Sequence, residues 1–353
     1  MHIPHCRGKP GNIAVQFDSL SELPWAVPGM HLTLRQLKVF EAVARRLSFS
    51  RAAEELHLAQ PTVSMQIKQL ADSAGLPLLE QVGKRIHVTE AGESVRIAAQ
   101  EVLKSLDVLA MTLAELKGLR QGKLKLAVVT TAKYFVPRLL GPFARQHPGI
   151  DIALEVGNRS EIIRRLSANE DDLYIMGAPP GGMDIERHPF ADNPIVAIAP
   201  NDHPLAGKRR VTLAMLAGES FLMRETGSGT RMSVERFLKE KGVRLKIKME
   251  LGSNEAIKQA VSGGLGLSML SLHALAQEAL RGELAVLNVD GLPIRRSWYI
   301  VHRAGKVLSP VARTFFDFLG QEGPALRLEL DARQRGVSAG RERSGRRTGR
   351  AGK

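Results

Sequence analysis

The chain has 353 residues, of which 44% are hydrophobic, so it is long enough for two or three domains that each bury a core. Its 50 Lys and Arg outnumber its 36 Asp and Glu, and the resulting net charge of +14 favours a polyanionic partner. Aromatic residues make up 5%, which argues against base stacking on single strands, and the single cysteine, Cys6, excludes a disulfide framework.

The two ends of the chain differ from its body. Residues 1–29 hold four prolines and no hydrophobic periodicity, which predicts a disordered extension and leaves Met1 and Met30 as alternative starts. Residues 331–353 carry seven Arg and one Lys against one Asp and one Glu. They predict a disordered basic tail, either a solvated appendage or an added attraction for phosphate. Without a membrane-length apolar run or a secretory signal pattern, we expect a cytoplasmic protein with no membrane partner.

Residues 34–70 predict three short helices. The first is indicated by steps of three and four between Leu34, Leu37, Phe40, Ala44 and Leu47. Ser48-Phe49-Ser50 offers a hydroxyl N-cap for a second helix over 51–56. The third begins at Gln60-Pro61 and runs to Leu70, with proline where its missing N–H costs nothing.

The third helix has two distinct faces when wound at about 100° per residue. Its apolar side consists of Val63, Ile67 and Leu70. Its polar side consists of Pro61, Ser64, Met65, Lys68 and Gln69, with Thr62 at the edge. Hydroxyls, amides and a cation with few carboxylates can contact base edges and phosphates, although any three-helix packing with a polar outer face would share this pattern.

The next segment favours DNA binding. Residues 78–89 predict two short strands around a Gly83-Lys84 turn, which is a basic wing. We therefore expect a winged helix-turn-helix over 30–89 that binds double-stranded promoter DNA. Its predicted DNA contacts are Ser50, Arg51, Gln60, Pro61, Thr62, Ser64, Met65, Lys68, Lys84 and Arg85.

A long linker helix is predicted over 90–119, opened by Thr89. Its heptad-like stripe consists of Val95, Ala98, Val102, Leu106, Leu109, Leu113 and Leu116. Such a stripe either packs on its own domain or forms the contact between two subunits of a dimer. Binding to two DNA half-sites requires two recognition helices, which favours the dimer contact. Gly118 to Gly122 would form the hinge to the next domain.

From residue 123 onward, strand and helix patterns alternate, which predicts an α/β domain with a parallel sheet. A late return strand at Ser297 to His302 suggests two α/β lobes, 123–193 plus 298–320 and 195–296. The two crossovers between them are expected near Asp192 to Pro194 and Arg295 to Trp298.

Three strand ends in this domain predict a pocket for a small anion, because ligands bind where strand ends meet helix N-termini. The expected effector-binding residues are Thr130, Thr131, Lys133, Arg224, Thr226, Gly227, Ser228, Thr230, Arg231, Ser253 and Asn254. Ordinary helix capping explains each stretch alone, and their convergence favours a site.

The sequence motifs give little support for a catalytic function. Gly227-Ser228-Gly229-Thr230-Arg231 lacks the Gly-Lys-Ser/Thr ending of a phosphate loop, and the ten histidines are scattered without a zinc motif. We expect no catalytic residues, no metal and no cofactor beyond the effector.

The order of motifs resembles a LysR-type transcriptional regulator over Met30 to about Leu319. The motifs are Leu-x-x-Phe, Ser-Phe-Ser-x-Ala-Ala, Gln-Pro-x-Val-Ser, Gly-x-x-Leu and Thr-x-Ala-Gly. Within that family, residues 81–84, 130–135 and 224–231 resemble the CbbR branch, regulators of Calvin-cycle (RuBisCO) operons. Leu79, Gln81 and Thr226 depart from the residues expected at their positions, Phe, Arg and Pro.

The resemblance implies a winged helix-turn-helix, a dimer or tetramer, and a two-lobed periplasmic-binding-protein-like effector domain. It also implies activation of carbon-fixation genes, a sugar phosphate, phosphoenolpyruvate or NADPH as effector, and RNA polymerase as a further partner. A LysR-type regulator with an aromatic or amino-acid effector and a solute-binding protein are the alternatives. Effector identity, operator and sign of regulation stay open.

Overall fold

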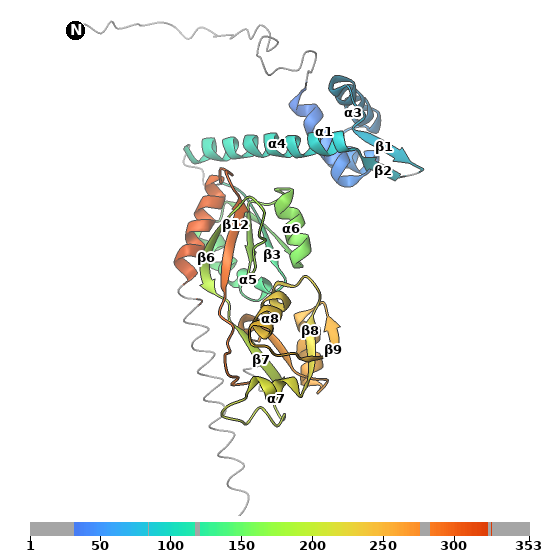
Figure 1. The fold of residues 1–353 in the computed structure, drawn as a ribbon. Coiled ribbons are helices and arrows are strands. Elements are labelled where there is room, and N and C mark those ends of the chain that lie inside the picture. The colour runs from blue at the N-terminus through green and yellow to red at the C-terminus, as the bar shows by residue number, and fades with distance from the viewer. Residues whose placement is uncertain (1–31, 84, 117–120, 276–282, 324–325, 327–353) are drawn as a thin grey trace, which may run out of the picture. The chain divides into compact units, whose positions relative to one another are not determined.

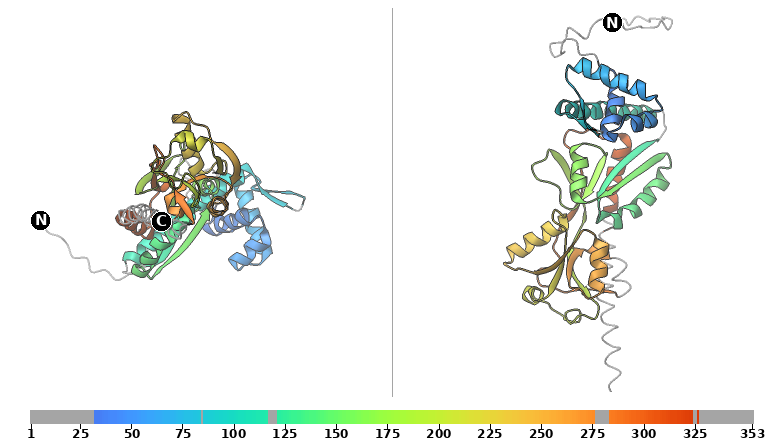
Figure 2. Two further views of the ribbon diagram at one scale, coloured as in Figure 1. Left: turned by 90° about the horizontal axis from the view of Figure 1, so that it is seen from below. Right: turned by 90° about the vertical axis from the view of Figure 1, so that its right-hand side faces the viewer.

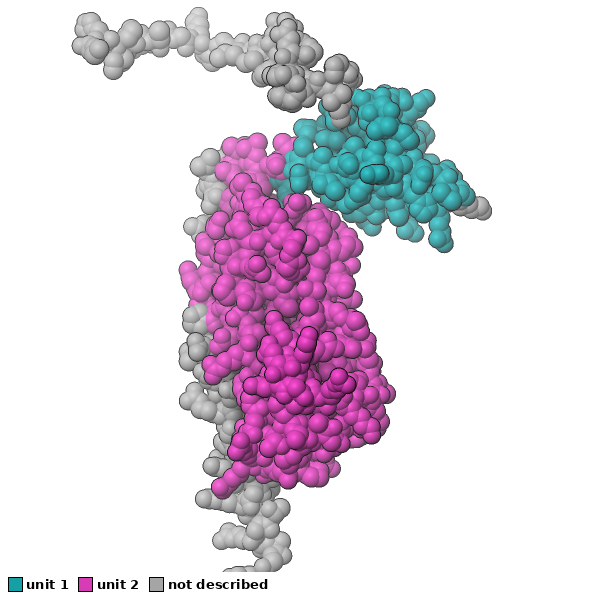
Figure 3. Space-filling model, viewed as in Figure 1, with its two compact units in different colours: residues 1–104 teal, residues 105–353 magenta. Residues whose placement is uncertain are grey.

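The computed structural model describes residues 32–83, 85–116, 121–275, 283–323 and 326. The chain divides into two compact units, residues 1–104 and 105–353 (Figure 3). No helix within those described ranges is long and apolar enough to cross a membrane. The predicted extension, the basic tail, Lys84 and residues 118–120 of the predicted hinge lie outside the described residues.

The first unit contains three packed helices and a hairpin. Its elements are α1 (Leu34–Arg46), α2 (Phe49–Leu56), α3 (Gln60–Ala74), β1 (Leu79–Val82) and β2 (Arg85–Val88). The predicted apolar face of α3 is confirmed, since Val63, Ile67 and Leu70 are buried. Leu34 and Leu47 were expected on the buried face of α1 but are each 50% exposed, because they stand at its first residue and its left-handed C-cap.

Two helix starts in this unit are set by hydroxyl caps. Thr33 and Gln36 form a capping box at α1. Ser48 accepts a hydrogen bond from the Arg51 backbone N–H, so α2 begins at Phe49, two residues earlier than predicted. Local capping chemistry therefore decides these boundaries.

Helix α4 (Glu90–Leu116) is the long straight helix in Figure 1. Thr89 opens it, since its hydroxyl accepts from the Gly92 N–H at 2.9 Å and donates to the Pro77 carbonyl at 2.7 Å. Along the predicted stripe, apolar side chains between 40% and 53% exposed are Val102, Leu106, Leu109 and Leu113. That stripe is therefore available to a partner surface.

The first lobe of the second unit is built on a five-stranded sheet in the order β4-β3-β5-β12-β6. Its strands are β3 (Gly122–Val129), β4 (Ile150–Gly157), β5 (Leu173–Met176), β6 (Ile185–Asp192) and β12 (Ser297–Arg303). Its helices are η2 (Ala132–Tyr134), α5 (Val136–Gln146), α6 (Arg159–Ser167) and a helix over 310–323.

The expectation of a parallel sheet is wrong in part. Strands β3, β4 and β5 are parallel, but β12 runs antiparallel to both β5 and β6. The reason is that β12 returns from the other lobe and enters the sheet from the opposite direction. Strand β6 was not predicted at all.

The second lobe has two small sheets, β10-β7-β11 and β8-β9, the first antiparallel and the second parallel. Its strands are β7 (Ile195–Pro200), β8 (Ser220–Arg224), β9 (Lys246–Leu251), β10 (Ser268–Ser271) and β11 (Leu284–Val286). Its helices are α7 (Leu213–Ala217), α8 (Gly229–Glu240), α9 (Asn254–Ser262) and η3 (Leu272–Leu275). Figure 2 shows the two lobes of this unit in two more orientations.

Two chain segments connect the lobes and lie side by side. The Asn193 N–H donates to the Arg296 carbonyl at 2.7 Å, and Ile195 pairs with Ile294 in an antiparallel bridge. The first segment joins β6 to β7, and the second leads into β12. Paired connections of this kind are suited to bending, because few contacts need to change when two lobes move.

Candidate functional site

A cavity in the second unit collects the ends of strands from both lobes. Its empty volume is about 380 Å³, which includes space that is open to solvent. The first lobe supplies the carboxyl ends of β3 and β5 and the start of α6, and the second supplies the end of β8 and the start of α8. The lining residues are Val129, Thr130, Thr131, Arg159, Met176, Gly177, Ala178, Arg224, Glu225, Ser228, Gly229, Thr230, Arg296 and Trp298.

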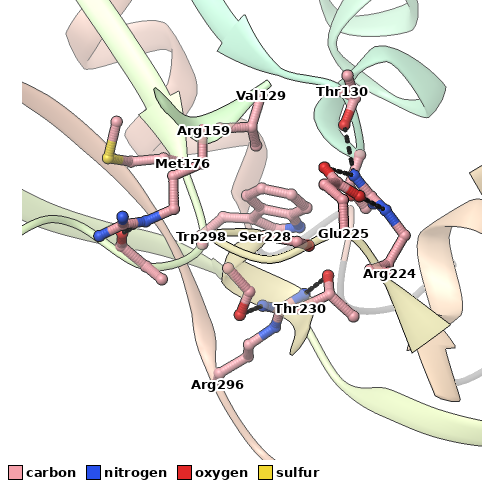
Figure 4. A pocket seen from close by; sticks show the side chains of 14 residues that line it. Val129, Thr130, Arg159, Met176, Arg224, Glu225, Ser228, Thr230, Arg296 and Trp298 are labelled. Atoms are coloured by element: carbon pink, nitrogen blue, oxygen red, sulfur yellow. Dashed lines mark hydrogen bonds and ion pairs between the residues drawn. The ribbon is translucent and has the colours of Figure 1, made fainter. Parts of the chain in front are cut away.

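Three arginines line this cavity, and one of them is paired with a carboxylate. The guanidinium of Arg224 bonds Glu225 through two hydrogen bonds of 2.6 and 2.7 Å (Figure 4). It also donates to Asn254 at 2.6 Å. Arg224 also reaches Thr130 of the first lobe at 3.5 Å. Arg224 therefore forms part of the cavity wall, and its positive charge is already paired with the carboxylate of Glu225.

The other two arginines have no carboxylate partner among the described residues. Arg296 donates to neutral acceptors, the Gly229 carbonyl and the Thr230 hydroxyl, each at 3.2 Å (Figure 4). Burial, with the neighbouring Arg224 charge, lowers the pKa of Arg296 to about 9. Burial also lowers the pKa of Arg159, whose Nε–H donates to the Ala178 carbonyl at 3.1 Å. Two partly buried cations that line one cavity without a carboxylate partner among the described residues favour an anion there.

Backbone donors reinforce this preference. Helix α8 begins at the cavity wall, and its N-cap Ser228 makes no side-chain capping hydrogen bond. The first turn of a helix carries N–H groups without intrahelical partners and a partial positive charge. The Ser228 hydroxyl and these N–H groups can therefore bind an anionic oxygen.

The indole of Trp298 adds a further donor. Its side chain is buried at the cavity wall, and its Nε1–H has no hydrogen-bond partner among the described residues. A buried N–H without a partner costs about 1–3 kcal/mol, so a bound oxygen or an ordered water would recover that energy.

Five of the predicted effector-binding residues line the cavity: Thr130, Thr131, Arg224, Ser228 and Thr230. Asn254 lies one contact behind the wall, where its amide donates to the Thr131 hydroxyl at 3.2 Å and accepts from Arg224. It holds residues of both lobes in place without lining the space.

The remaining five have other local partners. Ser253 caps α9, which is the ordinary capping role. Arg231 pairs with Glu235 and Glu250, and the Thr226 N–H donates to Glu250 at 3.0 Å. Lys133 lies over the Tyr134 ring, and Gly227 forms the turn before α8 with φ +87°. Their part in effector binding stays a prediction.

Arg159 and Arg296 were not predicted from the sequence. Arg159 follows Asn158, the N-cap of α6, directly after β4. The rule that ligands bind at the carboxyl ends of parallel strands would have pointed to it. Arg296 lies in a connection between the lobes, where no local pattern distinguishes it from its neighbour Arg295.

The predicted DNA-binding residues lie on the surface of the first unit. Exposed members of the set are Ser50, Arg51, Gln60, Pro61, Ser64, Met65, Lys68 and Arg85. Thr62 is half-buried, and Lys84 lies outside the described residues. Helix α3 thus presents the polar face that the sequence predicts, and base or phosphate contacts by these side chains stay a prediction.

Comparisons with known proteins find relatives of both the helical first unit and the second unit, which contains the cavity. Residues 34–93 match the model of the bacterial regulatory helix-turn-helix protein, lysR family, and residues 117–324 match the LysR substrate binding domain. The chain is 52% identical over 287 residues to the HTH-type transcriptional activator CmpR of Synechocystis, covering 81% of this chain and 94% of that protein. It is 47% identical over 302 residues to the RuBisCO operon transcriptional regulator of Acidithiobacillus ferrooxidans, covering 84% and 98%.

A solved structure resembles the second unit. The regulatory domain of Synechocystis CcmR in complex with 2-PG is 51% identical, with a TM-score of 0.56. The match covers 57% of this chain and 98% of that domain.

Proposed function

The chain belongs to the LysR family of bacterial transcriptional regulators, and from this premise we propose that it regulates carbon-fixation genes in response to a small anion. The anion binds in the cavity between the lobes. Two relatives are named as a RuBisCO operon regulator and as the activator CmpR, which supports this choice of target genes.

The proposal that the effector is an anion rests on the guanidinium groups of Arg159 and Arg296, which have no carboxylate partner among the described residues. A ligand with a phosphate and a carboxylate would satisfy both cations and the donors of α8. The 2-PG (2-phosphoglycolate) bound to the CcmR domain has that chemistry. A neutral aromatic effector would leave both charges unpaired, and the single carboxylate of a neutral amino acid would pair with at most one of them while its ammonium group adds a positive charge.

Calorimetric titration of the purified chain tests the effector. The ligands are 2-phosphoglycolate, ribulose bisphosphate, phosphoenolpyruvate and NADPH. Arg159→Gln should weaken binding of the active anion by about 10- to 100-fold, since a charge-assisted hydrogen bond is worth about 1.5–3 kcal/mol. Arg164→Gln is the matched control, because Arg164 lies on the same helix and pairs with Glu161 and Glu170 outside the cavity. Equal affinities of the two variants would place the anion elsewhere.

The DNA half rests on the exposed polar face of α3. We propose that Gln60 and Ser64 contact base edges while Lys68 contacts phosphate, because amides and hydroxyls read bases and ammonium groups bind phosphates. Both recognition helices of a dimer would then contact a pseudo-palindromic operator.

Footprinting on a RuBisCO promoter fragment tests this assignment. Ser64→Ala should abolish the preference for the operator over random DNA and leave effector binding intact. Lys68→Ala should weaken all DNA binding and reduce the salt dependence by about one counterion. Lys239→Ala, on α8, is the charge-matched control. An operator preference unchanged in Ser64→Ala would refute the recognition-helix assignment.

A further inference from the structure

Three potential metal ligands meet on the sheet of the first lobe. They are Glu186 and His188 on β6 and His302 on β12, and their ligating atoms all lie within 4.8 Å of one another. None of the three lines the cavity. In the antiparallel register, Glu186 lies opposite His302, and His188 is two residues further along β6. Alternation along a strand therefore places all three side chains on one face.

The ring of His302 is oriented for metal binding by its own hydrogen bond. Its Nδ1 lies 3.0 Å from the Arg303 carbonyl, and a carbonyl can only accept, so this nitrogen carries the proton. In neutral His302 the lone pair is then on Nε2, which lies 3.9 Å from the Glu186 carboxylate. A donor hydrogen bond on the second ring nitrogen is typical of metal-binding histidines.

The second imidazole is held beside the first. The His188 and His302 rings stack with centroids 5.7 Å apart, and the Phe316 ring meets the His188 ring edge-on at 5.0 Å. The His188 Nε2 lies 3.6 Å from the Glu186 carboxylate. Glu186 and His188 are 47% and 44% exposed at their side chains, so both ligands can adjust.

We propose that Glu186, His188 and His302 bind a divalent transition-metal ion of the zinc class. Two imidazoles and one carboxylate suit Zn²⁺, Co²⁺ or Ni²⁺, whereas Ca²⁺ and Mg²⁺ prefer oxygen ligands throughout. Ligand atoms about 2.1 Å from a tetrahedral ion lie about 3.4 Å apart, so the three ligand atoms, which all lie within 4.8 Å of one another, need to approach by at most about 1.4 Å. Water fills the fourth position.

Two cations near the cluster oppose an added positive charge. Lys306 donates to the carbonyls of Asp171 and Asp172 at 2.6 and 2.7 Å, and Arg313 lies over the Phe316 ring. Both are held by other partners, whereas the Glu186 carboxylate lies 3.6 and 3.9 Å from the two imidazole nitrogens. The bound ion would cross-link β6 and β12, the strands that join the two connections between the lobes.

Titration of the untagged full chain with Co²⁺, followed by visible absorption, tests the site. The background carries His2→Ala, His5→Ala and Cys6→Ser, because these three neighbouring residues are themselves metal-ligand types outside the described part of the chain. We expect one Co²⁺ per chain with the intense absorption of tetrahedral coordination, displacement by Zn²⁺ and a raised melting temperature. His188→Ala and Glu186→Gln should each weaken binding at least tenfold.

His203→Ala is the matched control. His203 lies 3.7 Å from Glu219, a pair with no third ligand in a metal-sized group among the described residues. This variant should bind Co²⁺ like its parent, and circular dichroism should be the same for all variants. Stoichiometric Co²⁺ binding that survives His188→Ala, or no saturable binding by the parent, would overturn the proposal.

Discussion

The hydroxyl of Tyr134, which follows β3 in the first lobe, donates a 2.6 Å hydrogen bond to the Glu255 carboxylate on α9 of the second lobe. Glu255 also pairs with Lys258, whose ammonium lies 4.9 Å from the centre of the Tyr134 ring. Together with the contact between Thr131 and Asn254, this bond joins the lobes at one end of the cavity. The observed arrangement is thus one in which both lobes contact each other directly.

Removing that hydroxyl should weaken effector binding without touching the cavity. If an anion binds best when the lobes are together, Tyr134→Phe loses a hydrogen bond to a charged group that helps hold them, worth about 1.5 kcal/mol or more. The Kd for the effector should rise about tenfold in calorimetric titration. Tyr299→Phe, on β12 of the same lobe, should leave the Kd unchanged. An unaltered Kd in Tyr134→Phe would mean that lobe contact and effector binding are independent.

Gly92 near the start of α4 should tolerate no larger residue. A Cβ there would lie 2.0 Å from the Leu78 carbonyl oxygen, a backbone atom that cannot move aside cheaply. Gly92→Ala should therefore destabilise the first unit by about 1–3 kcal/mol through overpacking. Hydrogen exchange in α1 to α3 measures this, with exposed Ser94→Ala as control. Equal exchange protection in Gly92→Ala and the parent would contradict the close approach.

The sequence predicts well what depends on local spacing. Val63, Ile67 and Leu70 are buried as their periodicity indicates, and strand ends after Val129 and Arg224 do meet at one cavity. It predicts poorly what depends on distant pairing. Strand β6 contains Pro189, and its exposure does not alternate residue by residue, so no local pattern marks it as a strand; it pairs with β12 more than one hundred residues later. The formation of such an edge strand is decided by its pairing with β12 and not by its local sequence.

The missed site residues have the same physical origin. Arg159 resembles Arg164 and Arg165 in the sequence, since all three lie on one short helix. Only the fold separates the arginine that faces the cavity from those that pair with Glu161, Glu170 and Asp171. The His188 and His302 cluster is likewise invisible to spacing motifs because its members lie on strands far apart in the chain.

The ion-pair cluster between α1 and α2 makes the first unit sensitive to acid. Hydrogen bonds from Arg45 at 2.5 Å, and next from Arg46 at 2.7 Å, lower the pKa of Glu55 from 4.5 to about 2. Because the folded pKa is depressed, the stabilisation is fully present above pH 4.5 and is lost as the pH falls towards 2. Glu55→Gln should lower the melting temperature of this unit at pH 7 and have little effect near pH 2. Glu54→Gln, its exposed neighbour, is the control. A difference that does not depend on pH would refute the ion-pair origin.

The exposed apolar stripe of α4 should be the dimer contact. Leu109 and Leu113 are 53% and 49% exposed, although the helix is long and its apolar residues follow heptad-like steps. Leu109→Lys would place a charge in a contact between two such helices. Burying an unpaired charge costs several times more free energy than losing a buried methyl group. Sedimentation equilibrium should then show the dimer dissociating at concentrations at which the parent stays associated.

Asp107→Lys supplies the control, since Asp107 is an exposed residue of the same turn of α4 on the side opposite Leu109. This variant also places a lysine on that turn and should keep the dimer. Operator affinity should follow the oligomeric state, because a monomer occupies a single half-site. Loss of the dimer in both variants, or in neither, would place the contact on another surface and leave the stripe of α4 without a partner role.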